Sequence, residues 1–131
     1  MDIQIETIHP AESAKLLNTE WFILHNAGDK PFSTRSCVLS VSRVGSKKKR
    51  QLGTMDPGVT LAPGGKVRII TGHPGRKAHG KQPTDDVPNY SLFLNAPVLK
   101  GKGTVLLVSL RTHSLAQAEY DPEAEGGLAA S

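Results

Sequence analysis

Cysteine is almost absent from this chain, because Cys37 is the one cysteine among 131 residues. A single thiol excludes an internal disulfide and a cysteine-rich zinc site. The chain is nevertheless long enough to bury a core without such cross-links. Free thiols are typical of reducing compartments, so the cysteine count is compatible with an intracellular protein.

Long apolar runs are also missing. No apolar stretch approaches the roughly 20 residues that span a bilayer. Residues 1–6 lack the basic and apolar regions of a secretory signal. We therefore expect an intracellular protein without a membrane partner. No segment shows the strong apolar periodicity of an amphipathic helix, which argues against a helical fold.

What the chain does contain is a series of short apolar bursts separated by turn residues, among them 13 glycines and nine prolines. Alternation of apolar and polar residues predicts half-buried strands, and the most apolar run, 104–110, predicts a central strand. Seven to nine short strands with turns between them are typical of an all-β sandwich or barrel. The expected strands are 3–6, 21–24, 37–42, 51–55, 59–61, 66–71, 90–94, 104–110 and 115–120.

Three segments carry a family resemblance. An apolar strand runs into an Asn-x-Gly turn over 20–31, a Leu-Ala-Pro-Gly-Gly corner leads into a strand over 59–69, and a hairpin of strands ends at Tyr120. In this order they resemble the lamin-tail domain, an immunoglobulin-like β-sandwich. The resemblance covers residues 1–122 and implies that fold. The acidic, Ala- and Gly-rich remainder, 123–131, is predicted to be a disordered tail.

The resemblance implies no active site and no cofactor. We therefore expect a non-catalytic binding or adaptor module that acts by protein–protein recognition, as part of a larger assembly. An exposed sheet edge would serve such a module, either by pairing with an extended peptide or by self-association. A purely structural subunit is a further interpretation.

Positive charge is concentrated in the middle of the chain. Ten Lys or Arg residues lie from Arg43 to Lys81, against one acid, Asp56. If the basic loops 43–50 and 72–81 met, they would form a surface for an anionic partner. The alternative function is therefore nucleic-acid binding that tolerates any base sequence. The non-functional interpretation is that the two loops are solvated and lie apart from each other. The candidate contacts are Lys47, Lys48, Lys49, Arg50, Arg76, Lys77 and Lys81.

An enzyme is the competing class. Residues 75–82 nearly match a nucleotide-binding phosphate loop, but Gln82 stands where Ser or Thr should hold Mg²⁺, and no helix pattern follows. His73 and His79 could share a metal only with a nearby acid such as Asp85 or Asp86. We expect both histidines to be exposed and predict no metal.

Two residues are expected to lie in the core. Trp21 heads an apolar strand, where its large ring is best buried. Cys37 begins an alternating segment that places Cys37, Leu39 and Val41 on the inner face, where a thiol acts as a small apolar group.

Overall fold

The computed structural model describes residues 2–99 and 101–129. Three 3₁₀ turns, η1 (Leu17–Thr19), η2 (Lys77–His79) and η3 (Glu125–Gly127), accompany the strands. The strands are β1 (Ile3–His9), β2 (Trp21–Asn26), β3 (Phe32–Ser33), β4 (Val38–Arg43), β5 (Arg50–Thr54), β6 (Thr60–Leu61), β7 (Lys66–Ile70), β8 (Asn89–Ser91), β9 (Thr104–Leu110) and β10 (His113–Glu119).

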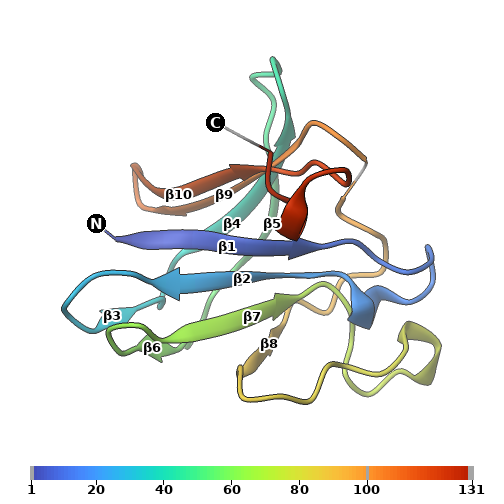
Figure 1. Cartoon of the computed structure of the whole chain (residues 1–131), viewed down its shortest axis with the longest axis horizontal. Coiled ribbons are helices and arrows are strands. Elements are labelled where there is room, and N and C mark those ends of the chain that lie inside the picture. The colour runs from blue at the N-terminus through green and yellow to red at the C-terminus, as the bar shows by residue number, and fades with distance from the viewer. Residues whose placement is uncertain (1, 100, 130–131) are drawn as a thin grey trace.

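The all-β sandwich prediction is confirmed. One sheet has the order β1-β2-β7-β8 and the other β10-β9-β4-β5, and the two form separate layers in Figure 1. The described residues hold ten strands where seven to nine are predicted, because the unpredicted two-residue strand β3 pairs with β6 in a small third sheet. The most apolar strand, β9, lies between β10 and β4, as expected of a central strand.

The core lies between the two four-stranded sheets. Alternate residues of β2 and β7, such as Leu24 and Val67, are fully buried against Leu39 of β4 and Leu106 of β9. Cys37 is also fully buried, as predicted, and burial raises the pKa of its thiol. The inner faces of the sheets thus supply a continuous apolar layer.

Trp21 does not lie in this core, so that prediction is wrong. The alternation of β2 turns Phe22 and Leu24 inward, which leaves Trp21 half-buried on the outer face. There its ring stacks on His9 at 4.9 Å, and the Arg68 guanidinium lies 4.6 Å from its centroid. The large ring is shielded by neighbours on its own sheet rather than by the opposite sheet.

Residues 123–129, the described part of the predicted disordered tail, are packed against the sandwich. After η3, Leu128 forms a β-bridge with Tyr120, and the Ala129 N–H donates to the Glu119 carbonyl at 2.9 Å. Leu128 also packs against the core, which gives this acidic segment an apolar anchor that the composition argument overlooked. Residues 130 and 131 of the predicted tail lie outside the described residues.

The long loop between β7 and β8 is held in place by hydrogen bonds. The Asn18 side-chain amide donates to the carbonyls of His73 and Gly80, at 3.0 and 2.8 Å. Further along, Asp85 forms an ion pair with the buried Arg68. These contacts fix both halves of the loop against the sheet.

Candidate functional site

The β4–β5 hairpin carries the first predicted basic cluster. Its turn begins at Gly45, which has φ +80°, and its base is braced by a hydrogen bond from the Val44 N–H to the Gly103 carbonyl at 2.9 Å. A hollow of about 310 Å³ lies against the hairpin. Its lining includes four basic residues of the hairpin, Arg43, Lys48, Lys49 and Arg50, and two apolar residues, Val41 and Val98.

The hairpin cations are available to a ligand. Residues 47–50 are all exposed. The ion pairs within the described residues involve Glu6, Asp85 and Asp121, and none of them engages residues 47–50. Arg43 differs, because its guanidinium donates to the Thr104 hydroxyl and to the Lys102 carbonyl. Arg43 is therefore a fixed wall of the hollow, while the other cations can turn toward an anion.

The second predicted cluster lines a hollow of its own. Arg76, Lys77 and Lys81 surround a space of about 290 Å³ in the β7–β8 loop. The loop is shaped by η2 and by Gly80, which has φ +84°. All three cations are exposed, and Arg76 donates to the Asn95 side-chain oxygen at 3.1 Å.

The two basic segments do not combine into one surface. They line different hollows, and Figure 1 shows the β4–β5 hairpin projecting at the top while the β7–β8 loop lies at the lower right. The hairpin belongs to one four-stranded sheet, and the loop follows a strand of the other. The single continuous surface considered from sequence is therefore replaced by two separate sites.

An aromatic residue that sequence reasoning missed lies beside the second cluster. Phe93 is 55% exposed, and its ring meets His73 edge-on, with centroids 4.9 Å apart. The sequence places Phe93 inside a predicted strand over 90–94, whereas β8 ends at Ser91. Only the fold shows that this ring reaches the surface next to a basic loop.

The histidines on this loop differ from each other. His79 is buried, contrary to expectation, and its Nδ1 accepts a hydrogen bond from the His73 N–H at 3.0 Å. His73 is half-buried, and its own Nδ1 accepts from the Gly75 N–H. Over 2–99 and 101–129, no group of three or more His, Cys, Asp or Glu side chains is placed to hold a metal ion.

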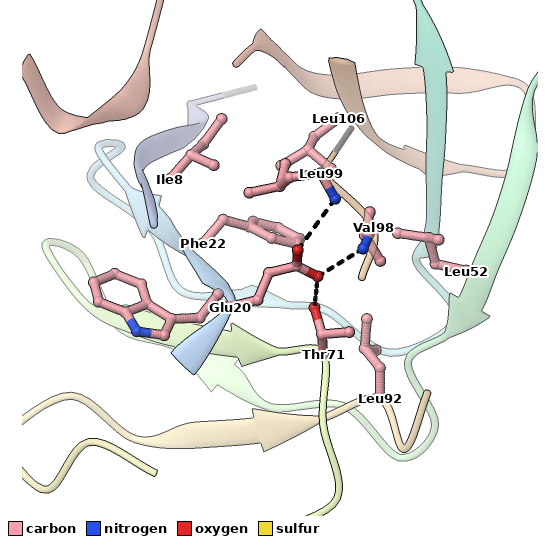
Figure 2. A pocket seen from close by; sticks show the side chains of 10 residues that line it. Ile8, Glu20, Phe22, Leu52, Thr71, Leu92, Val98, Leu99 and Leu106 are labelled. Carbon is pink, nitrogen blue, oxygen red and sulfur yellow. Dashed lines mark hydrogen bonds between the residues drawn. The ribbon is translucent and has the colours of Figure 1, made fainter. Parts of the chain in front are cut away.

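A buried carboxylate accepts several hydrogen bonds in the interior. Glu20 is 2% exposed and accepts hydrogen bonds from the Thr71 hydroxyl at 2.6 Å and from the N–H groups of Val98 and Leu99 at 2.8 and 3.2 Å (Figure 2). The adjoining cavity measures about 10 Å³, close to the space of one water molecule. Glu20 thus ties β2 to the segment before β9, which is a structural role.

Comparison with protein-family models and with curated proteins finds no match to this chain. Among the described residues, no helix has the length and apolar character needed to cross a membrane.

Proposed function

We propose that this chain is a non-catalytic recognition module, of the lamin-tail type that its sequence resembles, and that it binds the phosphate backbone of a nucleic acid through the β4–β5 hairpin. The observation that carries the proposal is the hairpin hollow, where Lys48, Lys49 and Arg50 are exposed beside the fixed Arg43. Of the two partner classes expected from sequence, this surface favours the nucleic acid.

The chemistry of the hollow suits phosphate better than a folded protein surface. Lysine ammonium groups bind phosphate as point charges, and arginine binds it with a planar fork of donors. Binding of this kind releases counterions and is insensitive to base sequence. Val41 and Val98 also line the hollow, and they offer no group that would read a base edge.

Protein recognition through a sheet edge is the second candidate. Strand β10 is at the edge of its sheet, which leaves one side of its backbone unpaired in the sheet order. Two features make β10 a poorer docking edge. The strand has a register shift between Ser114 and Ala116, and the Glu119 carbonyl already accepts a hydrogen bond from the Ala129 N–H. Self-association and assembly into a larger structure would likewise use an edge strand; in the two large sheets these are β1, β8, β10 and β5.

An intracellular location is part of the proposal. The single thiol, Cys37, is free and fully buried, which is compatible with a reducing compartment. A nucleic-acid partner is consistent with that location.

The test is fluorescence anisotropy of a labelled DNA duplex titrated with the protein at low salt. In the hairpin variant, residues 47–50 are all changed to Ser. We expect this variant to bind about tenfold or more weakly, because each phosphate contact contributes to a largely electrostatic affinity. Circular dichroism would verify that the variant keeps its fold, as expected for changes at exposed positions.

A matched control removes the same charge elsewhere. The control variant changes four exposed cations outside both basic segments to Ser: Lys15, Lys30, Arg35 and Arg111. If the hairpin is the contact, the control variant binds more tightly than the hairpin variant at the same net charge. If both variants lost the same amount of affinity for the duplex, only net charge would matter and the hairpin would not be the binding site.

A further inference from the structure

The backbone around Phe93 holds its ring outward. Phe93 has φ +58°, a left-handed conformation that bulky residues seldom adopt. Its two neighbours are anchored to the end of β7, because the Leu92 N–H donates to the Ile70 carbonyl at 2.8 Å and the Leu94 N–H to the Thr71 carbonyl at 2.9 Å. Leu92 points into the interior in Figure 2, whereas the residue after it is 55% exposed. Unusual conformations that the surroundings enforce tend to occur at ligand-binding sites.

His73 forms the second side of an aromatic corner. Its ring lies at 74° to the Phe93 ring, with centroids 4.9 Å apart. The backbone N–H and the Nδ1 atom of His73 both take part in hydrogen bonds within the loop, so the ring is held in one orientation. The corner is therefore formed before any ligand arrives.

Cations flank this corner, and the stretch of chain that carries them holds no acid. Arg76 is held by Asn95, two residues beyond Phe93, and shares its hollow with Lys77 and Lys81. No Asp or Glu occurs from residue 72 to residue 84. The next acid, Asp85, is engaged by Arg68 through hydrogen bonds of 3.1 and 2.6 Å.

We propose that Phe93 and His73 form a site for an unpaired nucleobase, which stacks on the exposed face of Phe93, while Arg76, Lys77 and Lys81 hold the flanking phosphates. An exposed aromatic ring beside a basic groove is the combination by which proteins bind single strands without sequence preference. A base inside a duplex is already stacked on its neighbours, so the site selects single strands. The proposal rests on the proposed function only in that the partner is a nucleic acid.

The experiment compares two labelled single strands of about 12 nucleotides, a length that such proteins cover. One is oligothymidylate, and the other carries the same phosphates but abasic sugars. Anisotropy gives the Kd of each strand for the wild type, for Phe93→Gly and for Phe93→Trp. Phe93→Gly removes the ring and suits the left-handed backbone, so loss of binding would not arise from misfolding. Ser36→Gly is the control, because Ser36 is also exposed and left-handed, with φ +70°, but lies outside both basic segments.

We expect the wild type to bind oligothymidylate about tenfold more tightly than the abasic strand, as one stacked base would give. Phe93→Gly should abolish this difference and leave the abasic strand unaffected, Phe93→Trp should retain it, and Ser36→Gly should not change it. A wild type that binds both strands equally overturns the stacking site. The proposal would also be overturned if an oligoglutamate peptide of equal charge displaced the labelled strand as effectively as unlabelled oligothymidylate does.

The failures of the two proposals are distinguishable. If Phe93→Gly has no effect while the hairpin variant still loses duplex binding, the stacking site is refuted and the proposed function stands. If the wild type binds none of these nucleic acids at low salt, both proposals are refuted.

Discussion

At the scale of single residues, the clearest determinant of the fold is a buried acid. The Glu20 carboxylate accepts hydrogen bonds from one hydroxyl and two backbone N–H groups that have been withdrawn from water. Buried donors without an acceptor are costly, so this carboxylate determines how the segment before β9 packs. Its negative charge also raises the pKa of Tyr120, after desolvation, which is the larger cause.

Replacing Glu20 by Ala should destabilise the protein by about 3 kcal/mol, because three donors lose their acceptor. Glu20→Gln should cost less, since the amide keeps one acceptor oxygen. The free energy of unfolding in urea measures both changes. Glu12→Gln is the matched control at an exposed position and should change stability by less than about 0.5 kcal/mol. A Glu20→Ala variant as stable as this control would contradict the structural role of the carboxylate.

At the scale of elements, an ion pair between Arg68 and Asp85 helps to fasten the second half of the β7–β8 loop to its sheet. The Arg68 side chain is 3% exposed, lies over Trp21 and pairs with Asp85. Its Nε atom is buried without a partner, so the guanidinium depends on its Nη groups for hydrogen bonds. The loop that carries the second basic hollow is therefore coupled to the environment of Trp21.

This fastening should weaken in acid. The hydrogen bond from Arg68, and then that from the Val87 N–H, lower the pKa of Asp85 below its ordinary 3.8. Because the pKa of Asp85 is lowered by folding, the ion pair stabilises the loop fully when the pH is above 3.8. This stabilisation is lost as the pH falls through the pKa that Asp85 has in the folded protein. Fluorescence of Trp21, the only tryptophan, should therefore change below about pH 4.

Asp85→Asn should remove this acid transition, and the exposed neighbour variant Asp86→Asn should keep it. The titration is monitored below about pH 5, the range in which aspartate carboxyls ordinarily change charge. An unchanged transition in Asp85→Asn would show that another group controls the ring.

The C-terminal element gives a second prediction at this scale. Gly127 is buried with φ +74°, and a Cβ atom there would collide with the Ile8 carbonyl oxygen. Gly126 has a similar φ of +69°, but a Cβ atom there would meet open space. Gly127→Ala should therefore displace Leu128 from the core and lower stability by about 1–2 kcal/mol more than Gly126→Ala, by the loss of buried apolar area. Equal thermal stability of the two variants would show that the segment is not packed against β1.

At the scale of the whole molecule, most of the sandwich could be predicted from local patterns. The alternation in 37–42 and the apolar run 104–110 predict strands that the structure contains as β4 and β9, with bounds shifted by a residue at most. The basic run after Gly45 forms a hairpin tip, as its turn chemistry indicates. These features depend on residues that are close together in the sequence, so the sequence of a single chain is enough to predict them.

The remainder depends on contacts between distant segments. Phe93 faces outward because its neighbours bind the end of β7, more than 20 residues away in sequence. Trp21 is shielded by His9 and Arg68 from two other strands, and Leu128 is ordered by Tyr120. No local pattern predicts these pairings, so the exposure of Phe93 could not be predicted, whereas the cations of the same loop are evident in the sequence.

The central claim is that the hairpin binds phosphates, and the salt dependence of duplex binding tests it most directly. Affinities are measured from roughly 50 to 200 mM salt for the wild type and for the variant with residues 47–50 changed to Ser. If all four cations contact phosphates, the slope of log affinity against log salt should be shallower by about 3–4 in the variant. Parallel slopes would mean that no phosphate contact was lost, and they would contradict the account.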